Sequence, residues 1–257
     1  MADLSRDERR AWIGALERAS SRAWPPHEDE PLGGWRLRYG GARSRRINSV
    51  CTSRFEAGGD VRGAIEQAAA WYRERGLPPC FQIAEGAEPA GLDGRLAARG
   101  YALLTPSTVM QAPAEAIATA ATSDADAVPL VDAPTPEHVA ALCDPVWPAD
   151  VRADRAALYA RIPSPRRFAL LHVDGEPAAS GLCVVDGDLA GIFSMRTARA
   201  FRRRGLGARL LRALARFAQG AGATRLYLQV EDDSPARSLY LRLGFEPVYG
   251  YHYRELA

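Results

Sequence analysis

The chain has 257 residues, of which 47% are hydrophobic and 25% are charged, and its formal net charge is +2. These values are ordinary for a globular protein and exclude collagen-like, disordered and coiled-coil classes. The length fits one large domain or two small ones, since domains average about 150 residues. We expect no membrane span, because no apolar run approaches about 18 residues. The charged N-terminus lacks the apolar segment of a secretory signal, which favours a cytoplasmic protein.

All 33 basic residues are arginines, a bias that GC-rich coding explains. Without lysine, the chain cannot use Schiff-base chemistry, a lysine general base or a P-loop lysine. The near-neutral charge gives no indication of a nucleic-acid or membrane partner. Cysteines and histidines do not occur at zinc spacing, so we predict no metal. The cysteines are expected to be small buried residues, at Cys51, Cys80, Cys143 and Cys183.

The first half of the chain predicts alternating strands and helices. Strands are expected at Trp35–Tyr39, Ile47–Thr52 and Phe81–Ala84, and helices at Val61–Arg75 and Leu92–Arg99. A polar cluster on the second strand can either solubilise a sheet edge or line an acceptor pocket, and consists of Arg45, Arg46 and Asn48. Small residues dominate Gln111–Pro129, which we interpret as a linker with some helical propensity.

The second half predicts the element order βααβββαβαβ. Strands are expected at Val128–Val131, Arg167–Val173, Ala178–Val185, Leu189–Thr197, Arg225–Val230 and Phe245–Arg254. Helices are expected from the cap Thr135 to Cys143, and at Arg152–Arg161, Leu206–Gln219 and Ser234–Leu243. Asp174-Gly175 and Asp186-Gly187 are hairpin signals, so the three middle strands should form an antiparallel meander.

Two fragments of the chain are weakly similar to each other. Phe81–Tyr101 and Leu228–Phe245 each predict a strand, a loop and a short helix, and the helices end at Gly100 and Gly244. Because the similarity occurs in both sequence and element order, we predict a duplicated fold.

A basic, glycine-containing turn connects a predicted strand to an amphipathic helix at Phe193–Leu214. The backbone N–H groups of a helix start, together with glycines and arginines, suit a pyrophosphate group. Three other interpretations are open. A solvated arginine cluster is one, and a nucleic-acid patch is another, although interleaved aromatic residues are missing. A Rossmann fingerprint with Glu231 on the ribose is the third, but Leu210 stands where a third glycine is needed.

The segment Arg202-Arg203-Arg204-Gly205-Leu206-Gly207 resembles the R/Q-x-x-G-x-G/A acyl-CoA loop of the GNAT N-acetyltransferase superfamily. Ser234–Phe245 resembles the closing A-x-x-L-Y-x-x-x-G-F signature of that superfamily, and the likeness extends over Ala127–Ala257. The first half is similar to degenerate first domains of tandem GNAT proteins. The resemblance therefore implies a tandem GNAT fold of the α/β (α+β) class, with a mixed, mostly antiparallel central sheet flanked by helices in each half. We expect a degenerate domain at 1–112, a linker at 113–126 and a catalytic domain at 127–257.

The resemblance assigns roles to individual residues. Strand-like hydrogen bonds to pantetheine would come from Met195, Arg196 and Thr197. The pyrophosphate loop corresponds to Arg202, Arg203, Arg204, Gly205, Leu206, Gly207 and Ala208. Asp233 stands where the family often has a cofactor-binding asparagine, and a carboxylate can only accept hydrogen bonds there. Tyr240 would protonate the departing thiolate, for which a phenol is a suitable acid.

Some residues depart from the family pattern. Gly191–Thr197 contains no carboxylate to act as the general base, and the substitutes are a water chain or Glu231, Asp232 or Asp188. The first half has lost both the loop and the acid, because Phe55, Gly58 and Leu96 stand opposite Arg202, Gly205 and Tyr240. We therefore expect an inert first half. Trp147 is either a pocket residue or a core residue.

The resemblance implies an N-acetyltransferase with acetyl-CoA as cosubstrate and no metal. The acceptor would be a primary amine, preferably of a small molecule rather than a protein, attacking directly in a ternary complex. The alternative is a non-catalytic acyl-CoA-binding sensor or interaction module. A dinucleotide-dependent oxidoreductase is a more distant third. The sequence identifies neither the acceptor nor the oligomeric state.

Overall fold

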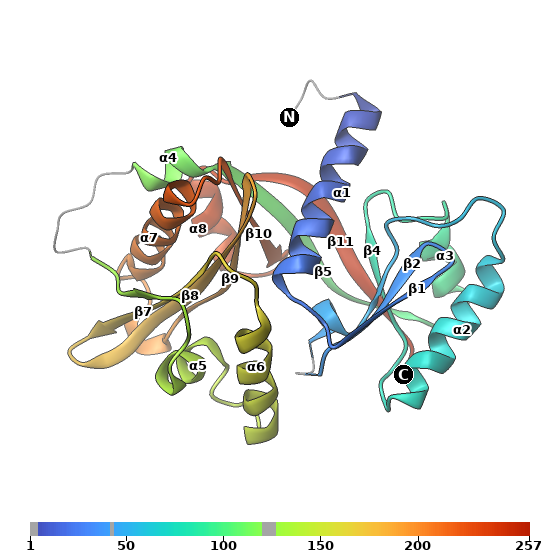
Figure 1. Cartoon of the computed structure of the whole chain (residues 1–257), viewed down its shortest axis with the longest axis horizontal. Coiled ribbons are helices and arrows are strands. Elements are labelled where there is room, and N and C mark those ends of the chain that lie inside the picture. The colour runs from blue at the N-terminus through green and yellow to red at the C-terminus, as the bar shows by residue number, and fades with distance from the viewer. Residues whose placement is uncertain (1–4, 42–43, 120–126) are drawn as a thin grey trace. The chain divides into compact units, whose positions relative to one another are not determined.

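The computed structural model describes residues 5–41, 44–119 and 127–257. The chain forms two compact units (Figure 1). Unit 1 comprises Met1–Val109 and Val248–Ala257, and unit 2 comprises Met110–Pro247. The unit boundaries therefore fall inside two strands, and the C-terminal strand belongs mainly to unit 1.

Unit 2 contains the end of β5 (Ala102–Pro113) and the start of β11 (Glu246–Glu255). Its other elements lie within the described residues of the unit. Its strands are β6 (Leu130–Val131), β7 (Arg166–Val173), β8 (Glu176–Asp186), β9 (Leu189–Thr197) and β10 (Arg225–Glu231). Its α-helices are α4 (Ala114–Ala118), α5 (Pro136–Leu142), α6 (Ala149–Arg161), α7 (Leu206–Gly220) and α8 (Ala236–Arg242). The strand order is β5-β10-β9-β8-β7-β6. The predicted antiparallel meander is confirmed, since β7 pairs with β8 and β8 with β9 in that sense.

Helices cover both faces of the unit 2 sheet (Figure 1). A Cβ placed on Gly181 of β8 would lie 2.8 Å from Leu210 of α7, so α7 packs closely on one face. The neighbouring Ser180 instead donates to the Ala141 carbonyl of α5 at 2.8 Å, which places α5 on the opposite face. Successive side chains of a strand point to opposite faces, and this alternation separates the two helix layers.

Unit 1 is built around a second set of strands. Its elements are α1 (Arg6–Ala23), β1 (Glu28–Leu32), β2 (Trp35–Tyr39), the 3-10 turn η1 (Arg45–Ile47), β3 (Val50–Cys51), α2 (Val61–Glu74), β4 (Cys80–Ala84) and α3 (Leu92–Ala97), together with most of β5 and β11. The strand order is β1-β2-β3-β4-β11-β5. Its core packs α2 and α3 on the sheet through Trp35, Ile65, Tyr72, Phe81 and Leu96.

The predicted duplication is present in the element order. β3-α2-β4-α3-β5 and β9-α7-β10-α8-β11 each run strand, helix, strand, helix, strand. In each series the first two strands pair in parallel. The equivalent loops are therefore those that precede α7 and α2.

The segment interpreted as a linker is partly structured. Gln111 to Pro113 complete β5, and α4 follows directly. Ala114, Ile117 and Ala118 are buried in the same core cluster as α7, because their small side chains permit close packing of the helix. Residues 120–126 of the expected linker lie outside the described part of the chain.

The polar cluster expected on a strand adopts a different structure. Arg45 lies in η1 and forms an ion pair with Glu255, with 2.8 Å between Nε and Oε2. The Asn48 side chain accepts from the Gly40 amide at 2.9 Å and donates to the Gly41 carbonyl at 2.7 Å. Arg46 lies 5.3 Å from the Trp24 ring. Asn48 therefore satisfies a backbone turn rather than projecting from a strand.

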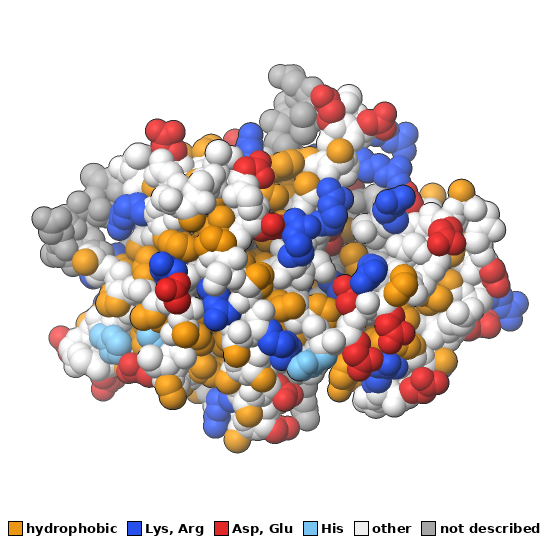
Figure 2. Space-filling view, viewed as in Figure 1, with side chains coloured by type: hydrophobic (Ala, Val, Ile, Leu, Met, Phe, Trp, Pro, Cys, Tyr) orange, Lys and Arg blue, Asp and Glu red, His pale blue; other side chains and the backbone are white. Residues whose placement is uncertain are grey.

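None of the helices in the described part of the chain combines the length and apolar character that a membrane crossing requires. Within the same residues, no three metal-ligating side chains come together. Cys80, Cys143 and Cys183 are buried free thiols, as predicted, whereas Cys51 is half-buried. On the face shown in Figure 2, arginine and acidic side chains are interspersed with hydrophobic ones, in keeping with the small net charge.

Candidate active site

The end of β9 is the first part of the site. β9 and β10 pair in parallel from Leu189 with Arg225 to Ile192 with Leu228. Beyond that point the register of β9 against β8 shifts in a bulge, and Ser194 there has a φ of +50°. A bulge bends its strand and ends regular pairing on one side. The last residues of β9 thus keep β8 as a partner and leave their other edge without a β10 partner.

Hydrogen bonding decides which backbone groups face that free edge. The Ala198 amide donates to the Ala178 carbonyl at 2.9 Å, so these residues form a hydrogen-bonded pair of the antiparallel ladder. Such pairs alternate with non-bonded ones, which makes Arg196 with Ser180 a bonded pair as well. Thr197 therefore directs its backbone groups away from β8, toward the free edge. The Met195 carbonyl does the same, because it shares a peptide unit with the Arg196 amide, which points to β8. Of the three residues expected to bind pantetheine, Arg196 has its backbone engaged with β8.

The start of α7 is the second part of the site. Gly205 is the N-cap residue, and its φ of +77° is a conformation that glycine adopts without steric cost. No side chain caps the helix, and its first turn contains no acidic residue. A Cβ at Gly205 would meet nothing within 4 Å. The first amides of this 15-residue helix thus remain available to an external anion.

The three consecutive arginines occupy different positions around this start. All of them are exposed. Arg202 donates from Nε to the Thr197 carbonyl at 3.2 Å, which ties the loop to the end of β9. Arg203 has a φ of +66°, a strained value for a residue with a side chain. The Arg204 guanidinium lies 5.3 Å from the Phe201 ring. Arg203 and Arg204 supply positive charge beside the uncapped helix.

The short helix α8 lies beside the first turn of α7. A Cβ on Gly207 would be 3.3 Å from Leu239 of α8 and 3.8 Å from the Thr197 hydroxyl. The next residue of α8, Tyr240, is 7% exposed and packs against the Phe245 ring at 5.9 Å. Burial raises the pKa of Tyr240 to about 12, so its hydroxyl stays protonated at neutral pH. Thr197 of β9 and Gly207 of α7 therefore lie close together, and Leu239 of α8, the residue before Tyr240, packs beside them.

The candidate general bases lie in different places. Asp188 is in the turn that precedes β9 and accepts the Arg225 amide through its carbonyl at 3.1 Å. About seven residues of strand, roughly 20 Å, separate it from Met195, which excludes Asp188 as a direct base. Glu231 and Asp232 are exposed at the end of β10, and Asp233 is exposed next to them. Glu231, Asp232 or water remain as candidates.

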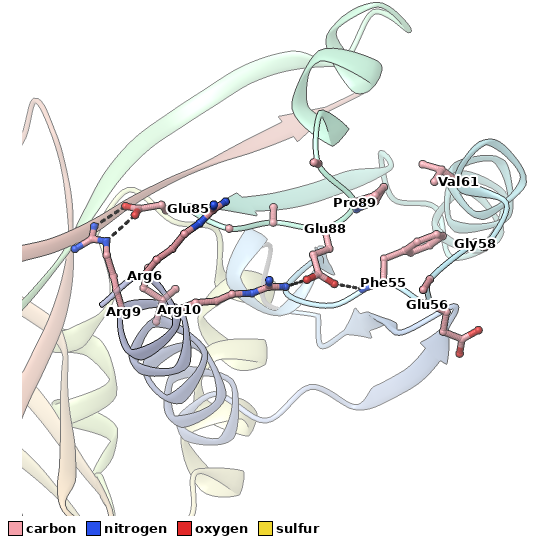
Figure 3. A pocket seen from close by; sticks show the side chains of 16 residues that line it. Arg6, Arg9, Arg10, Phe55, Glu56, Gly58, Val61, Glu85, Glu88 and Pro89 are labelled. Atoms are coloured by element: carbon pink, nitrogen blue, oxygen red, sulfur yellow. Dashed lines mark hydrogen bonds and ion pairs between the residues drawn. The ribbon is translucent and has the colours of Figure 1, made fainter. Parts of the chain in front are cut away.

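The equivalent loop of unit 1 is filled by the protein's own carboxylates (Figure 3). Asp60 caps α2 by accepting the Gly63 amide at 3.0 Å. Glu88 accepts the Phe55 amide at 2.8 Å and forms an ion pair with Arg10 of α1. A cavity of about 550 Å³ adjoins this loop, and its lining includes Arg6, Arg9, Arg10, Phe55, Glu85 and Glu88. Arg9 also forms an ion pair with Glu85, at 2.7 Å.

Sequence reasoning missed one pair of groups, and the structure places two residues that it had named. The carboxylates of Asp60 and Glu88 complete the loop of unit 1, although an aspartate before a helix is a readable cap signal. The side chain of Arg196 leaves the cofactor side and donates to the Cys143 carbonyl. Trp147 is half-buried before α6, with the Arg155 guanidinium 5.0 Å from its ring.

The fold is that of the GNAT superfamily, in a tandem of two GNAT-like units. The GCN5-related N-acetyltransferase from Kribbella flavida has a similar fold, with a TM-score of 0.70 at 18% identity over 96% of this chain and 94% of that one. A tandem GNAT protein from the clavulanic acid biosynthesis pathway is similar with a TM-score of 0.60 at 16% identity, over 94% and 87% of the two chains.

Sequence comparison is more specific. The chain belongs to the family described as "Probable histone acetyltransferase Rv0428c C-terminal", which matches residues 10–254. It is also 29% identical to the uncharacterized N-acetyltransferase YobR of Bacillus subtilis (strain 168), over 94% of this chain and 98% of the relative. Both matches include unit 1, beyond the 127–257 region on which the expected resemblance rests.

Proposed function

We propose that this chain transfers an acetyl group from acetyl-CoA to a primary amine of a small molecule, by direct attack in a ternary complex. The observation that carries the proposal is the start of α7, where uncapped amides, a left-handed glycine and two arginines adjoin the free edge of β9. Negative charge is favourable at such a helix start. The donor set therefore fits the pyrophosphate of a coenzyme A thioester.

Different residues of this site would bind different parts of the cosubstrate. The amides of residues 203–208 would hold the pyrophosphate, and the backbone of Met195 and Thr197 would hold pantetheine. When bound, acetyl-CoA supplies an acetyl thioester whose leaving group is a thiolate. The outward amide of Thr197 donates to the thioester carbonyl oxygen, where negative charge develops.

Proton transfer completes the reaction. The amine nitrogen forms the new bond to the acetyl carbon as the carbon–sulfur bond breaks, and the nitrogen loses one proton. Glu231, Asp232 or a water molecule accepts that proton. Tyr240 donates its hydroxyl proton to the thiolate as the sulfur departs, although the raised pKa makes it a weaker acid than an exposed tyrosine. No covalent enzyme intermediate is required.

A second candidate function is a non-catalytic acyl-CoA-binding sensor. It is favoured by the absence of a carboxylate from β9 and by the remote position of Asp188. Binding experiments do not distinguish this candidate from the transferase, because both require the same loop. Turnover distinguishes them.

Thermal unfolding with acetyl-CoA, desulfo-CoA and NADH is the first test. A ligand at about 100 times its Kd adds about 2.7 kcal/mol, and about 2–4 °C per kcal/mol makes this visible for a chain of this size. We expect Tm to rise with both CoA compounds and not with NADH. Thiol release with an amine panel follows. Binding without release would support the sensor, and no shift with either CoA compound would refute both candidates.

A further inference from the structure

The two faces of β9 have different surroundings within unit 2. Met195 packs on the α7 side, since its sulfur would lie 2.6 Å from a Cβ on Gly181. Ser194 faces the other side, where its hydroxyl lies 3.3 Å from the Tyr159 hydroxyl of α6. Arg196 shares that side and donates to the Cys143 carbonyl at the end of α5. The uncapped start of α7 belongs to the first face, which leaves the α5–α6 face for the second substrate.

A small cavity lies on the α5–α6 face at the end of β9. Its volume is about 170 Å³, and its lining includes Ala141, Pro145, Ala179, Ser180, Arg196 and Ala198. Arg196 is the one charged side chain among the described residues that line it. The Ser180 hydroxyl already donates to the Ala141 carbonyl. The recognition chemistry that the cavity offers is therefore mainly the guanidinium of Arg196.

Two further arginines surround the end of α5. Arg152 donates from Nη1 to the Trp147 carbonyl at 2.9 Å, and the Arg155 guanidinium stacks near the Trp147 ring. Burial raises the pKa of the Cys143 thiol, whereas Arg155, Arg152 and Arg196 all act in the opposite direction. Three positive charges thus lie within electrostatic range of one buried thiol.

Arg196, which lines the cavity, and Arg152, which lies outside that lining, are both held by backbone carbonyls. Asp150 and Asp154 lie on the exposed side of α6, and Asp144 accepts the Val146 amide at 3.1 Å. Within the described part of the chain, Arg152 and Arg196 contact only neutral carbonyls. A guanidinium has five donors, so most donors of each remain available to an oxyanion.

We infer that the acceptor is an amine that also carries an oxyanion, and that Arg196, assisted by Arg152, binds this oxyanion on the α5–α6 face. The inference rests on the proposed function, because it places the donor on the α7 side. A carboxylate or a phosphate supplies the required chemistry. A polyamine or a lysine-rich, histone-like peptide would instead bring positive charge toward three arginines, which is unfavourable.

Matched amine pairs test this inference with the full chain and acetyl-CoA. Each pair differs in the oxyanion alone: an α-amino acid and its amide, or an amino sugar with and without its phosphate. Spermidine and a lysine-rich peptide provide the cationic arm. We expect kcat/KM to be about tenfold or more higher for the oxyanion member of at least one pair, as a charge-assisted hydrogen bond implies. The pair that responds identifies carboxylate or phosphate.

Variants attribute the preference to the arginines. R196Q and R152Q should raise KM for the oxyanion acceptor about tenfold with little change in kcat. Both should keep the thermal shift with acetyl-CoA, which shows that the site is folded. R161Q is the matched control, since Arg161 is on the same helix as Arg152 but is not among the arginines that act on the Cys143 thiol at the cavity, and it should leave KM unchanged.

The failures are distinguishable. Preferred turnover of the neutral or cationic members would overturn the inference and leave the acetyltransferase function standing, as would an unchanged preference in R196Q. Thiol release with none of the amines would overturn the proposed function and the inference with it.

Discussion

Helices α7 and α2 begin at equivalent places in the two repeated element series, yet they present opposite surroundings to an anion. At α7 the cap is Gly205, no side-chain cap hydrogen bond forms within the described residues, and arginines precede the helix. At α2 the Asp60 carboxylate caps the helix, and Glu88 occupies the amide of Phe55 in the preceding loop. The fold thus supplies a potential phosphate site twice, and local side chains decide whether it stays open or is filled from within.

The comparison also explains the charges that surround α2. A carboxylate at a helix start gains from the same dipole and N–H groups that would bind a phosphate. Arg10 and Arg9 of α1 then pair with Glu88 and Glu85, so these two cations are also engaged. In unit 1, the protein's own carboxylates therefore stand where an anion would bind, and arginines of α1 balance their charge.

The largest expected effect concerns the acid, which only one series has. Tyr240 has Leu96 at the equivalent place, a residue without a hydroxyl. Y240F should reduce kcat about 10²-fold or more, because a positioned general acid contributes that much, and it should keep the thermal shift with acetyl-CoA. The thiol-release rate measures this. Y101F removes the hydroxyl of another buried tyrosine and serves as the control. An unchanged kcat in Y240F would show that another group protonates the thiolate.

The second prediction introduces at the start of α7 an aspartate cap like that of α2. G205D places a carboxylate beside the pyrophosphate position and should raise the Kd for acetyl-CoA about tenfold or more, through charge repulsion in partly desolvated surroundings. G205N is the matched control, because asparagine has the same size, tolerates the left-handed conformation and is neutral. Calorimetry gives both values. Equal Kd values for the two variants would mean that charge at this helix start does not govern binding.

The third prediction removes the Glu88 carboxylate from the loop that precedes α2. E88Q removes the ion pair with Arg10 and weakens the bond to the Phe55 amide, each contributing about 1 kcal/mol, so Tm should fall by several degrees. Added pyrophosphate should raise Tm more in E88Q than in the wild type, since Arg10 is free to bind it. If pyrophosphate acts equally on both proteins, Glu88 does not take the place of an anion.

The smallest effect concerns the short helices α3 and α8, which follow β4 and β10. Asp93 of α3 accepts from Arg254 at 2.7 Å and contacts His252 at the same distance. The Arg254 guanidinium is the main reason that the pKa of Asp93 falls from 3.8 to about 2. Burial opposes this shift, and His252 adds to the lowering. α8 has no acidic residue to form such a tie.

The sign of the pH dependence follows from that lowered pKa. The stability that Asp93 contributes is fully present above pH 3.8 and is lost as the pH falls through about 2. D93N should therefore be less stable than the wild type at pH 6, and the difference in Tm should shrink between pH 4 and pH 2. Because Asp93 is 41% exposed, we expect a modest difference. A constant difference across that range would show that the charge of Asp93 does not contribute.

Elements with strong local signals could be predicted from the sequence. The bounds of β9 match the expected strand, and α7 ends one residue beyond the expected helix. Turn residues and hydrophobic periodicity lie within these segments themselves. The capping box of Ser5 and Glu8 at α1 was an equally local signal, and α1 was missing from the expected elements.

Elements that depend on distant partners could not be predicted in the same way. β5 contains Pro106 and many small or polar residues, and its neighbours in the sheet are β10 and β11. α4 is short and poor in large side chains, and its burial depends on packing against α7. Such segments carry little periodicity, because their stability comes from contacts made after the chain has folded.

The sequence by itself determined the superfamily, because glycine spacing and motif order are local properties of the chain. It also located the loop before α7 and Tyr240, whose roles remain predictions. Only the tertiary structure decided that Glu88 fills the loop of unit 1, since Phe55 and Glu88 are 33 residues apart. It also decided that Arg196 turns its side chain away from α7, because the register with β8 sets which face each side chain of β9 occupies. Contacts between distant segments, rather than residue identity, decide where a charged side chain such as that of Arg196 lies and which groups it can bind.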